Sequence, residues 1–214
     1  EAYGLCTLMG PAEHAEALNG HHARLTSVGR EFGSAQVMIR GESGQPCAPG
    51  EVGEICICAP WVTPGFWKNP ELDVQRLQGG WLLTGDLGRM ESDGYLYLAD
   101  RKEDMIISGG YNVYPAEVEH ALAAHEAVAE SGVFAVPDEK WGEAVHAAVL
   151  LRPGAKVTEA ELIAFVRERL AYFKVPKAVH FVDAMPKTPV GKIVRRTLRE
   201  PHWAGHQRQV HGAA

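Results

Sequence analysis

The stretch LTGDLGRMESDGYLYLADRKEDMIISGGYN, residues 83–112, decides how this chain is organised. It sets glycine-rich turns and charged residues around two short apolar runs, 95–99 and 105–107, which we expect to be strands. Between these runs lies Asp100–Asp104 (DRKED), an unbroken series of charged side chains. Such a segment is too polar to be buried without partners, so we expect an exposed connector that joins two bodies.

Three motifs in this stretch resemble those of the acyl- and aryl-CoA synthetases of the adenylate-forming superfamily: Thr84–Asp86 (TGD), Asp100–Asp104 and Ser108–Asn112 (SGGYN). Further matches follow at 114–119 (YPAEVE), 136–143 (VPDEKWGE) and 186–193 (PKTPVGKI). The resemblance covers residues 1–199. It implies an enzyme that converts a carboxylic acid and ATP into an acyl adenylate and then transfers the acyl group to CoA.

The composition is that of an ordinary globular protein, with 46% hydrophobic and 22% charged residues in 214 positions. No apolar run approaches the length of a membrane span and no leader sequence is evident, so we expect a cytoplasmic protein. Lys and Arg outnumber Asp and Glu in residues 174–214. A basic end favours phosphate-bearing ligands, although it is equally compatible with a solvated surface. The resemblance implies small-molecule partners and no nucleic acid.

The apolar patterns predict an α+β fold. Strands at 35–40 and 52–59, separated by Gly and Pro turns, indicate an antiparallel subdomain. Beyond the connector, we expect a helix at 115–125, strands at 128–136, 144–151 and 178–182, and a helix at 162–170 after a capping box. The resemblance makes residues 1–102 the β-barrel-like end of a large domain. Residues 103–200 then form a small mobile domain with a short sheet and packed helices, and 201–214 a tail.

Three residues are the expected nucleotide contacts. The resemblance assigns Asp86 to the ribose hydroxyls and Arg101 to the ribose and a phosphate, while Tyr3 would stack on adenine. Without it, Asp86 is more simply a turn-capping residue, Arg101 a partner of Asp100 or Asp104, and Tyr3 a packed aromatic residue.

Magnesium is expected with ATP, but its ligand cannot be identified. The family has a glutamate after the aromatic residue, and here Thr7 or Leu8 stands at that position, depending on register. Neither supplies the carboxylate oxygen that magnesium prefers.

The second domain carries the remaining expected sites. Glu103 occupies the family's hinge position, in a connector where backbone dihedrals can change without disturbing a core. Gly109 and Gly110 would let the pantetheine arm of CoA approach, although a Gly-Gly pair is usually only a turn. The resemblance places three further residues near the CoA nucleotide, each with the alternative of an ordinary surface or core residue: Trp141, Phe173 and Lys177.

Lys192 is the expected catalytic residue. The segment 186–193 is not a phosphate-binding P-loop, because Pro186 replaces the first glycine and Ile193 replaces the Ser or Thr that must follow the lysine. It matches the family's C-terminal catalytic loop, whose lysine stabilises charge as pyrophosphate leaves. From the residues alone, Lys192 is an exposed surface lysine.

The other candidate ligands are weaker. Cys56 and Cys58 alternate with isoleucines and are expected to be small core residues. His202 and His206 have helical spacing, but no acid lies between them, so a metal site is not expected.

The resemblance leaves more than half of a family enzyme absent upstream, including the triphosphate loop, so we expect a C-terminal portion that is inactive alone. Alternatives are an adenylation domain that loads a carrier protein and a nucleotide- or CoA-binding module without catalysis.

Overall fold

The computed structural model describes residues 1–205 and has the expected α+β fold. The chain divides into two compact units, one ending at Lys102 and the other beginning at Glu103. Each unit has its own sheet, and no strand pairing joins the two sheets within the described residues. Within residues 1–205, no helix is both long and apolar enough to cross a bilayer.

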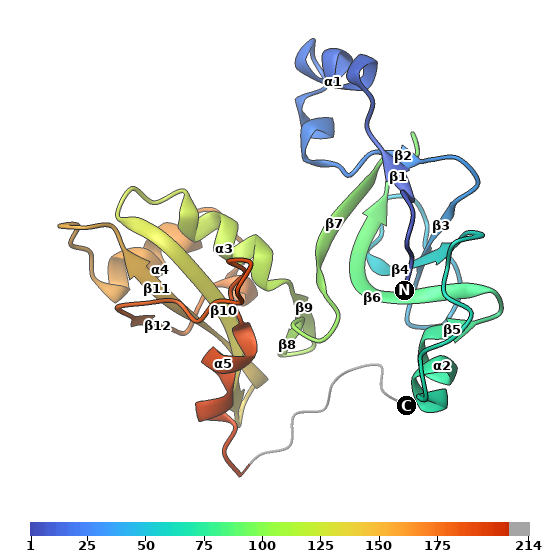
Figure 1. Cartoon of the computed structure of the whole chain (residues 1–214). Coiled ribbons are helices and arrows are strands. Elements are labelled where there is room, and N and C mark those ends of the chain that lie inside the picture. The colour runs from blue at the N-terminus through green and yellow to red at the C-terminus, as the bar shows by residue number, and fades with distance from the viewer. Residues whose placement is uncertain (206–214) are drawn as a thin grey trace. The chain divides into compact units, whose positions relative to one another are not determined.

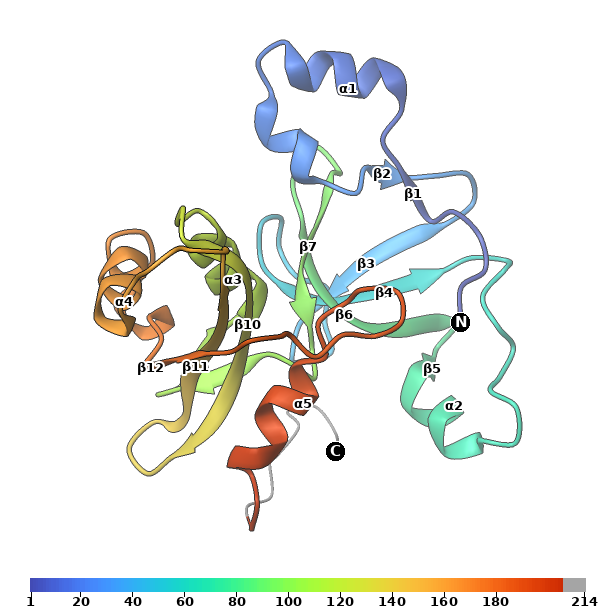
Figure 2. The same cartoon turned by 60° about the vertical axis from the view of Figure 1, so that its left-hand side comes forward.

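The first unit is built on a five-stranded antiparallel sheet (Figure 2). Its strands are β3 (Gln36–Arg40), β4 (Gly53–Cys58), β5 (Leu77–Gln78), β6 (Trp81–Met90) and β7 (Leu96–Arg101). The order is β3-β4-β6, with β5 and β7 both paired to β6. The described strands form an open sheet rather than a closed barrel. A separate ribbon joins β1 (Thr7–Leu8) to β2 (Arg30–Glu31).

Two short helices in this unit were not predicted from the sequence. They are α1 (Pro11–Leu18) and α2 (Pro70–Arg76), each with proline in its first turn. Asn69 caps α2 by accepting a hydrogen bond from Leu72 N, a start signal that a turn-rich surrounding sequence conceals. The 3-10 helix η1 (His22–Thr26) follows α1.

The connector is shorter than predicted. Asp100 and Arg101 are not loop residues, because β7 continues through them and pairs them with Leu87 and Asp86 of β6. Since β7 pairs with β6 alone among the described strands, charged side chains at its end remain solvated. The turn itself begins at Lys102.

The second unit is organised around a long antiparallel hairpin formed by β10 (Val128–Asp138) and β11 (Gly142–Leu151) (Figure 1). The free edge of β11 pairs at one end with β8 (Ile106–Ser108) and along its middle, in parallel, with β12 (Ala178–Phe181). Strand β9 (Tyr111–Val113) completes the sheet by pairing with β8.

One face of this sheet is covered by α3 (Pro115–Ala123) and α4 (Glu159–Arg167). Thr158 and Glu161 form the predicted capping box, so α4 starts three residues earlier than the predicted helix. The core beneath the helices consists of alternate residues of β10 and β11 with the inward residues of both helices, among them Val133, Ala147, Leu122 and Leu162. Alternation therefore leaves Phe134 and Ala148 on the opposite face.

The opposite face is covered by the end of the chain. Met185, Ile193 and Leu198 pack with Phe134 and Ala148 in a second cluster. Helix α5 (Arg195–Arg199) and the 3-10 helix η3 (Glu200–His202) follow. Trp203 then donates its indole N–H to Ala135 O at 2.8 Å. Both faces of the hairpin are thus buried.

Three histidine rings surround Phe134 on this face: His146, His180 and His202. His146 Nδ1 lies 3.0 Å from His180 Nε2, and the His202 ring centroid is 6.0 Å from that of His146. Burial, followed by the charges of the other two imidazoles, lowers the pKa of His146 to about 4, against the opposing effect of Glu159 and Asp138. His146 therefore packs as a neutral ring at neutral pH.

The histidine cluster predicts a loss of stability in mild acid. A histidine with a lowered pKa in the folded state binds fewer protons than in the unfolded chain, so the free energy of unfolding should fall as pH drops from about 6.5 to about 4. His146→Gln, which keeps a polar side chain without this titration, should weaken that dependence. Urea denaturation followed at amide resonances of β10 and β11, at pH 7 and pH 5, measures it.

The exposed Ala123 on α3 supplies the control, because Ala123→Gln introduces the same side chain without removing a titratable group and should leave the pH dependence as in the unmodified chain. An undiminished loss of stability in His146→Gln would show that the cluster is not its source.

Candidate functional site

In the first unit, Asp86 and Arg101 lie together. The register of β6 and β7 places them opposite each other, and Arg101 Nε is 2.7 Å from Asp86 Oδ1. Both side chains are partly exposed, 39% for Asp86 and 57% for Arg101. Adjacent acceptors and donors of this kind suit a ribose and its phosphate. Of the two partners considered for Arg101, Asp100 accepts a hydrogen bond from its backbone N–H, and Asp104 pairs with Arg195.

The backbone around Asp86 is held by Glu54, a residue that sequence reasoning missed. Gly85 N donates to Glu54 Oε1 at 3.1 Å, and Lys102 Nζ donates to Glu54 Oε2 at 2.8 Å. Glu54 is only 8% exposed, so its charge is compensated by these donors. The available signal was a lone acid within the apolar run 52–59.

Gly88 is required by close chain packing. A Cβ at this position would lie 2.6 Å from Tyr97 O and 2.9 Å from Ile55 Cδ1. The glycine is therefore required where β6 shifts register against β7.

Tyr3 is 98% exposed, which excludes the packed-aromatic alternative for it within the first unit. The loop that follows offers Cys6, Thr7 and Leu8, and no carboxylate. The described residues also contain no group of three or more His, Cys, Asp or Glu side chains suited to a metal ion. These residues do not fit a magnesium site. Of the histidine pair in the tail, His202 belongs to the cluster around Phe134 and His206 lies outside the described residues.

The cysteines agree with the expected core role. Cys56 is fully buried, and burial raises the pKa of its thiol to about 11. Cys58 is half-buried.

Glu103 is exposed in the turn after β7, and its carbonyl accepts a hydrogen bond from Arg199 Nη1 at 3.4 Å. The next residue, Asp104, is 16% exposed and pairs with Arg195 Nη1 at 3.0 Å. An exposed residue, Glu103, is thus followed directly by Asp104, which an ion pair holds in the second unit.

Three of the expected CoA residues gather in the second unit. Gly109 N donates to Trp141 O at 2.8 Å, and a Cβ on Gly109 would lie 2.6 Å from Trp141 Cε3, so only glycine fits against the indole. Lys177 Nζ lies 5.3 Å from the centroid of the Trp141 ring, and Lys140 Nζ lies 4.7 Å from it. Gly110 follows with a φ of +83°. An aromatic surface with two ammonium groups suits a phosphorylated nucleotide.

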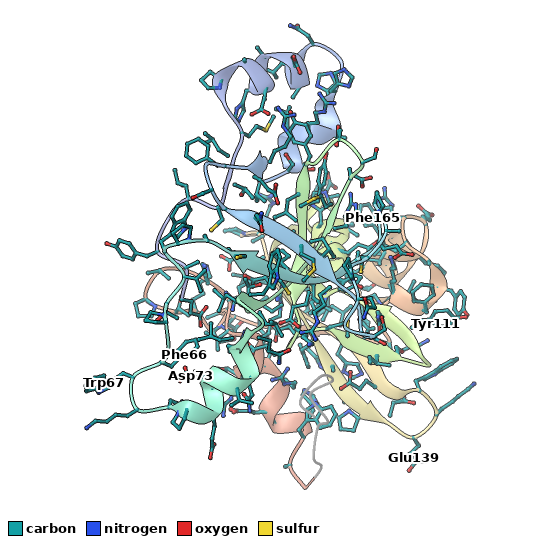
Figure 3. All side chains as sticks on the ribbon, turned by 90° about the vertical axis from the view of Figure 1, so that its right-hand side faces the viewer. Phe66, Trp67, Asp73, Tyr111, Glu139 and Phe165 are labelled. Atoms are coloured by element: carbon teal, nitrogen blue, oxygen red, sulfur yellow. The ribbon has the colours of Figure 1, made fainter. Side chains whose placement is uncertain are left out.

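Phe173 belongs to a neighbouring aromatic group instead. It lies in the 3-10 helix η2 (Tyr172–Lys174) and stacks on Tyr111, with ring centroids 4.5 Å apart and an interplanar angle of 18°. Tyr172 contacts both rings edge-on. Tyr111, labelled in Figure 3, thus covers one face of the Phe173 ring. Sequence reasoning missed both tyrosines, although Tyr111 directly follows the Gly-Gly pair.

Glu143 fixes the strand that leads into the Gly109–Gly110 loop. It is 6% exposed, and its Oε2 accepts a hydrogen bond from Ile107 N at 2.9 Å. The Trp-Gly-Glu motif at 141–143 therefore supplies both the indole that packs against Gly109 and the carboxylate that binds the backbone of β8.

Lys192 is exposed on a tight loop. Thr188 N donates to Lys192 O at 2.8 Å, Lys192 N donates to Thr188 Oγ1 at 3.1 Å, and Val194 N closes the base of the loop on Pro186 O at 2.8 Å. Ile193 beside the lysine packs in the second cluster of the sheet. The ammonium is thus presented by an ordered loop.

The Gly109–Trp141 surface and the loop that carries Lys192 lie toward opposite ends of the β10–β11 hairpin. Trp141 directly follows the hairpin tip, marked by Glu139 in Figure 3. At the other end, Lys187 pairs with Glu130 at 2.7 Å, and a Cβ on Gly132 would meet Ile193 at 3.2 Å. The strand from Gly132 to Asp138 spans about 20 Å at ~3.3 Å per residue.

Known proteins resemble the chain in both sequence and structure. Residues 117–192 match the AMP-binding enzyme C-terminal domain. A long-chain-fatty-acid–CoA ligase of Bacillus subtilis is 47% identical over 96% of this chain and 37% of its own length. A 2-succinylbenzoate–CoA ligase of Geobacillus kaustophilus is 48% identical over 82% of this chain and 36% of its own length.

The structural comparison agrees. The o-succinylbenzoate CoA synthetase of Bacillus subtilis, solved with its acyl-adenylate intermediate, matches with a TM-score of 0.81 and 37% identity over 91% of this chain and 38% of that one. The chain spans just over a third of the length of these relatives. The chain therefore corresponds to the C-terminal portion of adenylate-forming acyl- and aryl-CoA synthetases, and residues 117–192 carry the AMP-binding enzyme C-terminal domain.

Proposed function

We propose that this chain is the part of an acid–CoA ligase that binds the nucleotide ribose, supplies the adenylation lysine and receives CoA. The carboxylic acid is activated by ATP to an acyl adenylate, with release of pyrophosphate. The thiol of CoA then attacks the acyl carbon, and AMP leaves. The names of the relatives support the reaction class, while the particular acid is left open.

The observation that carries the proposal is the separation of Lys192 from the Gly109–Trp141 surface along one hairpin. A group that stabilises charge must lie within contact distance of the reacting atoms. The strand positions beside the two sets, Gly132 and Asp138, are about 20 Å apart on one hairpin, so we infer that the two sets serve different steps. They can serve two successive steps if the second unit changes orientation between them.

Each residue then has a defined task. Asp86 accepts the ribose hydroxyls, and Arg101 binds the ribose and phosphate beside it. The ammonium of Lys192 faces the negative charge that develops at the α-phosphate as the acid attacks. After rotation at Glu103, the Gly109–Gly110 backbone admits the pantetheine arm. Trp141 and Lys177 contact the CoA nucleotide. Phe173 also contacts it if the Tyr111 ring moves off the Phe173 face that it covers. Tyr3 stacks on adenine.

The first test separates the two half-reactions in an enzyme that contains this chain. Lys192→Ala should lower acid-dependent exchange of pyrophosphate into ATP by roughly 10²- to 10³-fold, because a charge stabiliser is lost from the adenylation transition state. Thioester formation from supplied acyl adenylate should be far less affected. Lys156→Ala, at an exposed lysine elsewhere in the second unit, is the control.

Equal loss of both half-reactions would contradict the assignment of Lys192 to one step. The 214-residue chain assayed alone should show no exchange, and measurable acid-dependent exchange would overturn that expectation. Acyl transfer only to a carrier protein would indicate a carrier-loading enzyme. Nucleotide binding without exchange in the longer enzyme would indicate a binding module.

The second test concerns Glu103. Proline fixes φ near −65° and removes the backbone donor, so Glu103→Pro should trap one orientation of the second unit. One half-reaction should survive and the other should be lost, measured by the same two assays, with the circular dichroism spectrum unchanged. Glu103→Ala, which removes only the carboxylate, should keep the two rates in their normal ratio. Wild-type rates for both steps in Glu103→Pro would place the pivot elsewhere.

A further inference from the structure

Arg195 joins the residue that follows Glu103 to the body of the second unit. Its Nη1 lies 3.0 Å from Asp104 Oδ2. The other side of its guanidinium binds Glu119 of α3 in a fork, with Nε 2.8 Å from Oε1 and Nη2 2.7 Å from Oε2. Only arginine offers donors on both sides of one rigid plane, so this geometry is specific to it.

The network is largely shielded from solvent and continues into the sheet. Arg195 is 17% exposed, Asp104 16% and Glu119 19%. Glu119 Oε1 also accepts a hydrogen bond from Val133 N of β10 at 2.8 Å. Arg199, one turn further along α5, lies 3.7 Å from Asp104. Ions held this far from water are weakly screened, and their directions are fixed by several bonds at once.

The chain between Lys192 and Arg195 has little slack. Only Ile193 and Val194 separate them; Ile193 is packed against the sheet, and Val194 N is bonded to Pro186 O at 2.8 Å. A displacement of the Arg195 backbone must therefore displace the loop that carries Lys192.

We propose that Arg195 is a positioning residue that couples the orientation of the Glu103 turn to the placement of Lys192. When the backbone rotates at Glu103, Asp104 moves with the second unit, and the guanidinium keeps the base of the lysine loop in a fixed position relative to Asp104. Arg195 acts through Lys192 and touches no substrate. The inference rests on the proposed two-step function.

The coupling through Arg195 concerns the end of the hairpin that packs against the lysine loop, and it does not concern the Gly109 loop. The Gly109 loop follows Asp104 directly through β8, which is held by its pairing with β11 and by the hydrogen bond from Ile107 N to Glu143. Loss of Arg195 should therefore impair the step that needs Lys192 and spare the step that needs Gly109. A residue that merely stabilised the fold would affect both steps.

The experiment compares Arg195→Met, Asp104→Asn and the double variant in the longer enzyme. Misplacement of a catalytic group by about 1 Å costs up to roughly a hundredfold in rate, so kcat for pyrophosphate exchange should fall by about ten- to a hundredfold with KM for ATP nearly unchanged. Thioester formation from supplied acyl adenylate should change less than twofold to threefold. The double variant should lose little more than Arg195→Met, because both changes break the same link.

Arg196→Met is the matched control, since Arg196 is 77% exposed and its one ion pair among the described residues is with Glu200, four residues further along the chain. Unchanged exchange in Arg195→Met would refute the coupling, as would equal loss of both half-reactions. If Lys192→Ala leaves exchange intact, the proposed function itself fails. If Arg195→Met leaves exchange intact while Lys192→Ala abolishes it, the proposed function is retained and the coupling is refuted.

Hydrogen exchange on the 214-residue chain gives a readout independent of activity. Arg195→Met should increase amide exchange at both Met105 and Lys192, while Arg196→Met should leave both unchanged. Faster exchange throughout β10 and β11 would indicate general destabilisation and contradict a positioning role.

Discussion

The second unit depends on a hairpin that is buried on both faces. Because β10 and β11 alternate apolar side chains on each side, one set packs under α3 and α4 and the other needs a second cover. That cover is the returning chain from Met185 to Trp203, so the segment that bears Lys192 is also a structural layer. The lysine loop is ordered because its neighbours are required by the core, and the exposed lysine sits where this layer turns.

Partly or fully buried acids hold the functional loops through backbone N–H groups. Glu54 binds Gly85 N beside the Asp86 motif, Glu143 binds Ile107 N before the Gly-Gly loop, and Glu119 binds Val133 N beside the lysine loop. In each case the carboxylate satisfies a backbone donor near a site, and Lys102 and Arg195 compensate the charges of Glu54 and Glu119. Rigid support of this kind leaves the exposed residues Asp86, Gly109 and Lys192 available to ligands.

The sequence predicted the elements whose signals are local. The strands of the β10–β11 hairpin and the capping box of α4 follow from alternation and caps, whereas α1 and α2 are too short for a periodic pattern to be distinguished from a loop. Motif residues were identified by resemblance, but their partners were not. The ion pair between Asp86 and Arg101 arises from the β6–β7 register, and the bond of Arg195 to Asp104 joins positions far apart in the chain. Likewise, the stacking of Tyr111 on Phe173 depends on where η2 packs against β9.

The proposed two-step function requires that the second unit presents the two ends of its hairpin to the reaction centre in succession. Spin labels at Glu139→Cys on the hairpin tip and Ser92→Cys in the first unit, in an enzyme that contains this chain and lacks other reactive cysteines, would report the distance between the units by pulsed electron resonance. We predict one dominant distance with ATP and a non-reactive acid analogue, and a clearly different one with acyl adenylate and a non-reactive CoA analogue. A single unchanged distance in both states would contradict a reorientation of the second unit between the two steps.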